Sequence, residues 1–177
     1  MTRPVLVTDR LVLRPHEMRH LEPSVAMWGS PNVTRHIGGK TRSRQETWFT
    51  ICRMRGMWDL LGYSYWAIEN RQTGQFLGEC GFSDFMRGMK PDLSEWPEAG
   101  WVFAEAAWGK GYASEAVTAM HDWLDENRPG QSVCIINPEN TGSQRVAEKC
   151  GYEFWQTSEY GGAAVNVFRR TAGNQLA

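Results

Sequence analysis

The opening third of the chain carries apolar positions whose spacing predicts one strand and two helices. Val5 to Arg14 begins with β-branched and leucine residues, which is typical of a strand. Arg19 to Trp28 predicts a short helix that ends at a Gly-Ser-Pro sequence. A second helix is expected to begin at Ser43, because Glu46, three residues later, completes a capping box. Its apolar face consists of Ile51, Met54, Trp58 and Leu61.

The rest of the chain alternates between strand and helix patterns. Short β-type runs predict strands over Tyr63–Glu69, Gln75–Phe82, Ala99–Phe103, Ser132–Ile136, Tyr152–Thr157 and Ala163–Arg169. One helix pattern follows Gly111, and another begins at Asn140 and stops at Gly151. Met86–Pro97 is expected to be a long loop. This order predicts a single α/β or α+β domain over residues 1–177, with residues 172–177 as a frayed tail.

Charge and composition narrow the classes of function. A net charge of -1 gives no field that attracts nucleic acid or an anionic membrane, so neither partner is expected. The run of Arg42, Arg44, Arg53 and Arg55 is interpreted as a solvated helix face, with a local basic patch as the alternative. The four cysteines, at positions 52, 80, 134 and 150, lack metal-site spacing and lie among apolar neighbours, as buried free thiols do. With no apolar signal segment at the start, these features predict a metal-free cytoplasmic protein.

The strongest chemical motif is a glycine-rich turn between a predicted strand and a predicted helix. It comprises Trp108, Gly109, Lys110, Gly111, Tyr112 and Ala113. Backbone N–H groups at a helix start have no partners within the helix, and the helix dipole adds positive potential there. Glycines let such a backbone approach a phosphate closely, so the turn is a candidate pyrophosphate site to which Lys110 adds a charge. The alternative is an ordinary tight turn before a helix.

Four motifs in order resemble the GCN5-related N-acetyltransferase superfamily, and most closely its branch of enzymes that acetylate the N-termini of ribosomal proteins. They are Thr8-Asp9-Arg10-Leu11-Val12-Leu13-Arg14, Glu98-Ala99-Gly100-Trp101, Trp108-Gly109-Lys110-Gly111-Tyr112-Ala113-Ser114-Glu115-Ala116, and Asn140-Thr141-Gly142-Ser143 through Lys149-Cys150-Gly151-Tyr152. Together they extend over nearly the whole chain. Any one of them alone is a weak signal, but their order makes the resemblance specific.

The resemblance implies a mixed, strongly curved and splayed central sheet flanked by about four helices. It also implies acetyl-CoA as acyl donor, with no metal. The pantetheine arm would lie between the strands at Ala99–Phe103 and Ser132–Ile136 and pair with Trp101, Val102 and Phe103. An N–H group near Phe103 would hold the oxyanion. The phosphates would lie on the glycine-rich turn, and Asn140 and Ser143 would border the cofactor.

Catalytic roles follow from what an amine and a thioester require. A protonated amine must lose a proton before attack, and Glu98 is the first candidate base, directly or through a water, with Glu79 second. Each has a plain alternative as a solvent-facing glutamate. Many relatives place a tyrosine acid where this chain has Ala147, so Ser143 becomes the candidate that assists the leaving thiolate. The alternative is that Ser143 is an ordinary polar residue at the helix start that bonds only Asn140.

The resulting hypothesis is direct transfer of an acetyl group to a primary amine in a ternary complex. Its rivals are a non-catalytic coenzyme A sensor and an enzyme that transfers a longer acyl group. The acceptor stays open among a protein N-terminus, a small amine such as an amino acid or polyamine, and an aminoglycoside-like drug. The acceptor wall is expected to be acidic and suited to cationic amines, through Asp84, Asp92, Glu95 and Glu98. His36 is a weaker candidate on the acceptor side, and oligomeric state cannot be read from the sequence.

Overall fold

A computed structural model describes residues 3–173 of the chain. The strands are β1 (Leu6–Val7), β2 (Leu11–Pro15), β3 (Tyr65–Asn70), β4 (Phe76–Ser83), β5 (Glu98–Phe103), β6 (Gln131–Ile136), β7 (Glu153–Tyr160) and β8 (Ala163–Thr171). The α-helices are α1 (Leu21–Trp28), α2 (Pro31–Thr34), α3 (Arg44–Leu61), α4 (Tyr112–Asn127) and α5 (Thr141–Lys149). None of the helices in this described part combines the length and apolar character that crossing a membrane requires.

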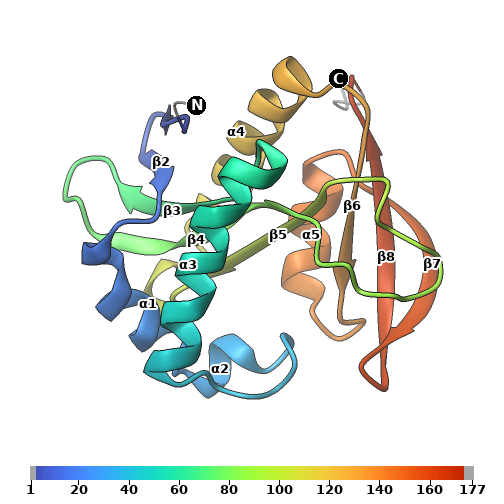
Figure 1. The fold of residues 1–177 in the computed structure, drawn as a ribbon, viewed down its shortest axis with the longest axis horizontal. Coiled ribbons are helices and arrows are strands. Elements are labelled where there is room, and N and C mark those ends of the chain that lie inside the picture. Colours follow the sequence, from blue (N-terminus) through green and yellow to red (C-terminus); the bar gives the residue numbers. More distant parts are fainter. Residues whose placement is uncertain (1–2, 174–177) are drawn as a thin grey trace.

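The eight strands form one mixed sheet in the order β1-β2-β3-β4-β5-β6-β8-β7. All neighbours are antiparallel except β5 and β6, which are parallel and share a single register pair, Glu98 with Val133. Beyond that pair the two strands diverge. The sheet therefore divides into two arms, β1–β5 and β6–β8–β7 (Figure 1). This is the curved and splayed mixed sheet that the resemblance predicts.

Helices cover both faces of the first arm. Side chains on a strand alternate between faces, so residues three apart point in opposite directions. On β4, Glu79 contacts Trp28 of α1, whereas Phe82 stacks edge-on against His121 of α4. It follows that α1 and α4 lie on opposite faces. A tryptophan cluster of Trp58, Trp66 and Trp123 joins α3, β3 and α4, with ring centroids 4.8 to 5.7 Å apart.

Most predicted elements form, and the differences have local causes. The first predicted strand forms as two separate strands, because Thr8, Asp9 and Arg10 make a turn between β1 and β2. Pro31 begins the unpredicted short helix α2, which raises the α-helix count to five among the described residues. The capping box of Ser43 and Glu46 is confirmed at the start of α3. Of the predicted tail, residues 174–177 lie outside the described residues.

Two side-chain predictions are wrong. Cys52 is exposed rather than buried, because it falls on the outer face of α3. His121 lies on the helix that follows Gly111, where the sequence pattern predicts partial exposure, but it is buried and bonds the hydroxyl of Tyr152 at 3.0 Å. That hydroxyl also lies 2.9 Å from the hydroxyl of Ser132. Burial lowers the pKa of His121 to about 4, so the ring is neutral near pH 7 and serves the core.

Candidate functional site

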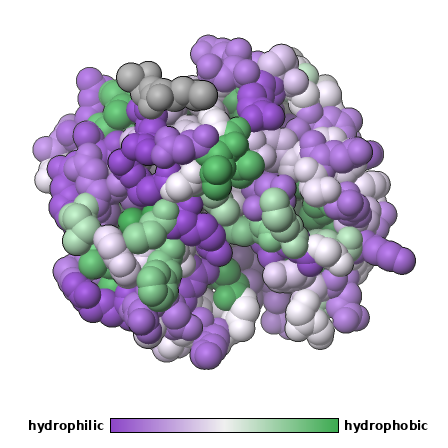
Figure 2. All heavy atoms as spheres, in the orientation of Figure 1, coloured by the Kyte–Doolittle hydropathy of each residue, from purple (hydrophilic) through white to green (hydrophobic). Residues whose placement is uncertain are grey.

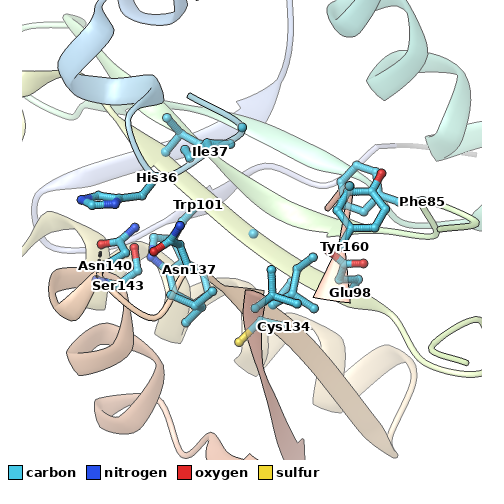
Figure 3. A pocket seen from close by; sticks show the side chains of 18 of the residues that line it. His36, Ile37, Phe85, Glu98, Trp101, Cys134, Asn137, Asn140, Ser143 and Tyr160 are labelled. Atoms are coloured by element: carbon cyan, nitrogen blue, oxygen red, sulfur yellow. Dashed lines mark hydrogen bonds between the residues drawn. The ribbon is translucent and has the colours of Figure 1, made fainter. Parts of the chain in front are cut away.

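A cavity of about 730 Å³ lies where the two arms of the sheet separate. One wall is the β5 segment from Glu98 to Val102, and the facing wall runs along β6 from Cys134 to Asn137. The surface is notched between the two arms (Figure 2). In Figure 3, His36, Asn140 and Ser143 lie at one end of the cavity, and Phe85, Glu98 and Tyr160 lie at the other. We call these the helix end and the acceptor end.

The edge of β5 that faces the cavity carries backbone groups without a strand partner. The N–H of Ala104 donates to the carbonyl of Leu77 on β4, at 2.9 Å. Because successive N–H groups of a strand point to opposite edges, those of Phe103 and Trp101 point toward the opening. The carbonyl of Phe103 accepts a hydrogen bond from the indole Nε1 of Trp108, at 2.8 Å. This edge is therefore suited to a ligand that carries amides of its own.

The glycine-rich turn leads directly into α4, as predicted. Gly109 and Gly111 have φ angles of 72° and 76°, which side-chain-bearing residues adopt only with strain. Gly111 is the N-cap of α4, so the N–H groups of Tyr112 and Ala113 stand in its first turn. The ammonium of Lys110 donates to the carbonyl of Ala106 at 2.7 Å and thereby ties the turn to the chain before it.

Arg10 holds this turn from outside, a role that the sequence reasoning missed. Its Nη1 donates to the carbonyl of Lys110 at 2.9 Å, and its Nε lies 2.7 Å from a carboxylate oxygen of Glu115. The guanidinium also stacks over the Tyr112 ring, 4.7 Å from its centroid. The motif at Thr8–Arg14 contained this residue but gave no sign of its contacts. Since Arg10 and α4 are distant in sequence, only the fold brings them together.

The helix end of the cavity is formed by the start of α5. Asn140 caps the helix, and its side-chain oxygen accepts from the N–H of Ser143 at 3.1 Å. Asn140 and Ser143 both line the cavity beside Asn137 (Figure 3). Ala147, one turn further on, is fully buried and has no group that can donate a proton. Ser143 is therefore the hydroxyl that α5 presents to the cavity.

Glu98 lies at the acceptor end, buried and paired. Its two carboxylate oxygens each lie 2.7 Å from a nitrogen of Arg87, in a forked arrangement. Burial raises the pKa of Glu98, although the Arg87 pair pulls it in the other direction. The same pair raises the pKa of Arg87 despite its own burial. Glu98 is thus an anion held in place by a cation, which is not how a solvent-facing glutamate behaves.

Glu79 is the second carboxylate that lines the cavity. It is 1% exposed and accepts a hydrogen bond from the Nε1 of Trp28 at 3.1 Å. His16 lies beside it, with 3.4 Å between its Nε2 and a carboxylate oxygen, and neither ring nitrogen has a hydrogen-bond partner among the described residues. Burial raises the pKa of Glu79 to about 7, and burial lowers that of His16 to about 3. Glu79 therefore changes charge near neutral pH beside a neutral ring.

The predicted acidic wall forms only in part, because Glu98 is the one of its four residues that lines the main cavity. Asp84 and Asp92 line an adjoining cavity of about 350 Å³ that shares Phe85, Arg87 and Glu98 with the main cavity, and Glu95 is exposed. The loop turns this way because Met89 and Leu93 are buried against Val133 and Val167 of the second arm. The main cavity is instead lined by the arginines Arg35, Arg42, Arg53 and Arg87. Two of these belong to the run that was interpreted as a solvated helix face.

Metal ligation is not indicated by the arrangement of the described residues. Within residues 3–173, no group of three or more histidine, cysteine, aspartate or glutamate side chains gathers in a way that holds a metal ion. Cys134 lines the cavity from β6, but burial raises its pKa well above the ordinary value, which disfavours the thiolate. The polar chemistry of the site therefore lies in carboxylates, arginines, a hydroxyl and backbone amides.

Comparisons with known proteins agree with this geometry. The family model of the acetyltransferase (GNAT) domain matches residues 10–153. The uncharacterized protein YkkB of Bacillus subtilis (strain 168) is 32% identical over 96% of this chain and 96% of its own length. An acetyltransferase from Agrobacterium tumefaciens str. C58 superimposes with a TM-score of 0.80 at 29% identity, covering 96% of this chain and 95% of its own. The ribosomal L7/L12 alpha-N-protein acetyltransferase RimL, solved with coenzyme A, shares the fold at 16% identity, with a TM-score of 0.77 and coverage of 95% and 98%.

Proposed function

This chain belongs to the GNAT acetyltransferase family, and from that premise we propose that it transfers an acetyl group from acetyl-CoA directly to a primary amine in a ternary complex. The observation that carries the proposal is the open edge of β5, which has backbone amides without a strand partner. The same domain also has a glycine-rich turn at the start of α4. An extended, amide-bearing chain that ends in a pyrophosphate matches both features.

Donor binding uses main-chain groups for the most part. The N–H groups from Gly109 to Ala113 take the pyrophosphate, supported by Lys110 and by Trp108 at the first position of the turn. The pantetheine arm pairs with the β5 edge at Trp101, Val102 and Phe103. Asn140 and Ser143 border it from α5. Backbone recognition fits a turn that begins with Trp108, because the amides do not depend on that side chain.

Two groups, one on β5 and one on α5, stabilise the charges that develop during transfer. The N–H of Phe103 points into the opening and is the donor we assign to the oxyanion of the thioester carbonyl. Its alignment is fixed because the Trp108 indole already holds the carbonyl of the same residue. The hydroxyl of Ser143 is assigned to the leaving sulfur, since Ala147 has no proton to give.

The base that accepts the amine proton is assigned to Glu98, directly or through a water, with Glu79 as the second candidate. Both line the cavity, and burial raises the pKa of each. They differ in their partners, because Glu98 is engaged by Arg87 through both oxygens, whereas Glu79 accepts from the Trp28 indole. A base with a pKa of about 7 gives a rate that rises as the pH passes through 7, since the carboxylate form is the active one.

The deciding experiment measures acetyl-CoA binding by calorimetry and thiol release with amine acceptors, for the parent protein and matched variants. Loss of the base, as Glu98→Gln or Glu79→Gln, is expected to lower kcat by about 100-fold or more with donor affinity retained. The variant that flattens the rise in rate with pH identifies the base. Ser143→Ala tests the leaving-group role in the same assay. Binding without release for any amine supports the sensor alternative, and absence of binding refutes the proposal.

A further inference from the structure

The acceptor end of the cavity holds more positive than negative charge. Four arginines line the cavity, at positions 35, 42, 53 and 87, against two carboxylates, Glu79 and Glu98. Arg87 and Glu98 neutralise each other in their forked pair. Of the other three arginines, Arg35 is attracted by Glu105, so Glu79 alone remains to balance Arg42 and Arg53. Its pKa of about 7 leaves Glu79 partly protonated at neutral pH. The surplus has no counterpart among the described residues of the cavity.

Two of these guanidinium groups have no carboxylate within ion-pair distance among the described residues, although Glu79 attracts both from further away. Within the described residues, the side chains of Arg42 and Arg53 take part in no hydrogen bond or ion pair. Arg42 instead stacks over the Trp28 ring, 3.4 Å from its centroid, and Arg53 stands 5.8 Å from the Phe85 ring. Stacking fixes the plane of a guanidinium and leaves its N–H edge free. Both groups therefore present unused donors to the cavity.

The donor's phosphates do not account for these arginines. The phosphate turn lies at residues 108–113, and none of those residues lines the cavity that contains Arg42 and Arg53. Arg53 instead shares the Phe85 ring with Arg87, which also stacks on Tyr160 at 4.5 Å. This aromatic and cationic group belongs to the acceptor end, where Glu98 and Tyr160 lie together in Figure 3.

We propose that the acceptor amine carries a carboxylate as well, which Arg53 and Arg42 hold at the acceptor end of the cavity. This proposal rests on the proposed function and narrows its substrate class. A guanidinium edge matches the two coplanar oxygens of a carboxylate and bonds them in parallel. Amino acids, and peptides with an acidic residue near the N-terminus, meet this description. Polyamines and aminoglycosides do not, because additional positive charges would be placed against unpaired arginines.

The test compares acceptors that differ in one group. Thiol release is measured at saturating acetyl-CoA for pairs that present a carboxylate or a carboxamide, such as γ-aminobutyrate and its amide, and short peptides with Asp or Asn at the second position. Spermidine and a phosphate-bearing amine of similar length complete the set. The carboxylate member of each pair is expected to have a kcat/KM roughly 10- to 100-fold higher than its amide. Spermidine is expected to be the poorest.

Variants on one helix show whether the preference comes from Arg53. Arg53→Gln is expected to raise KM for carboxylate acceptors and to leave their amides and the affinity for acetyl-CoA unchanged, so the preference disappears. Arg53→Lys restores part of it, since the charge remains but the fork does not. Arg44→Gln is the matched control, because Arg44 lies on the same helix, outside the cavity, in an exposed pair with Glu22. It keeps the full preference.

Each other result overturns the proposal. Equal rates for acids and amides, or a preference unchanged in Arg53→Gln, overturn it while acetyl transfer itself stands. Faster transfer to the phosphate-bearing amine overturns the choice of carboxylate. If no acceptor is turned over, calorimetry with an N-acetylated amino acid and its amide decides, and equal affinity or absence of binding overturns the proposal. Binding of acetyl-CoA is measured separately by calorimetry, and its absence counts against the proposed function.

Discussion

The phosphate turn and the acceptor end of the cavity are built in different ways. The turn is one continuous segment, residues 108–113, in which two glycines take left-handed φ angles and a helix follows at once. The acceptor end gathers Arg42 and Arg53 from around α3, Phe85 and Arg87 from the loop after β4, and Tyr160 from the end of β7. A local motif can specify the first, whereas the second exists only when distant segments meet.

This difference predicts which properties a substitution changes together. A feature made by neighbouring residues keeps its local geometry, so the glycine-rich turn proposed to bind the donor can be recognised from a motif. A feature made by distant residues depends on each contact that joins them, such as the Arg87–Glu98 pair between the loop and β5. Damage at one region should therefore leave the other intact.

Arg87→Met is expected to break the acceptor end most severely. It leaves the buried Glu98 carboxylate unpaired, which costs about 3 kcal/mol in the free energy of unfolding. Because the phosphate turn does not depend on this contact, affinity for acetyl-CoA is expected to change by less than roughly twofold. Urea denaturation and calorimetry measure the two quantities. Arg44→Met, which breaks an exposed pair, should cost less than about 0.5 kcal/mol. An equal loss in both variants would contradict this account.

Glu79→Gln is expected to change how stability depends on pH. The pKa of Glu79 in the folded protein, about 7, lies above its ordinary value of 4.5, so the folded state holds this proton more tightly than the unfolded state. The parent protein therefore loses stability from this group as the pH rises from 4.5 to 7, on the order of 3 kcal/mol in total. Glutamine does not titrate, so the variant should match the parent near pH 5 and exceed it at pH 8. Denaturation curves at both pH values test this, and a difference that is independent of pH would exclude the assigned pKa.

Gly111→Ala is expected to damage the phosphate turn and spare the acceptor end. Its φ of +76° strains any residue with a side chain, and an added Cβ would lie 3.4 Å from the guanidinium of Arg10. Affinity for acetyl-CoA should fall roughly 10-fold because the amides of the turn move. Gly74→Ala is the control, since that glycine has φ +70° with open space around it. It should lose similar stability with unchanged affinity, and equal affinity losses in calorimetry would refute the phosphate assignment.

Arg10→Gln gives the smallest expected effect and tests whether the turn is wholly local. The substitution removes the bonds to Lys110 and Glu115, which are partly exposed, so affinity for acetyl-CoA should fall about fivefold. Arg71→Gln is the control, because Arg71 bonds the same β1–β2 turn through the carbonyl of Thr8 without a contact to the phosphate turn. Unchanged affinity in Arg10→Gln would show that residues 108–113 hold their shape unaided.

The elements of the fold were largely predictable, whereas the surroundings of single side chains were not. Periodicity places α4 and both members of the capping box at α3, because these depend on residues a few positions apart. The same patterns missed the burial of His121 and the pairing of Glu98 with Arg87. Those depend on what lies across the fold, which a window of neighbouring residues does not contain.

The acceptor end shows most clearly what local sequence patterns do not predict. Counting acidic residues near Glu98 predicted a wall for cationic amines. Met89 and Leu93 are buried against the second arm, and Asp84 and Asp92 line the adjoining cavity instead of the main one. Arg42 and Arg53 line the main cavity, and Arg53 is at the same time exposed to solvent, as its charge pattern indicated. The sequence by itself determined the order of strands and helices along the chain and the glycine-rich turn before α4, because local spacing encodes both. Only the tertiary structure decided the sign of the net charge at the acceptor end, because the charged side chains there come from distant segments that the fold brings together.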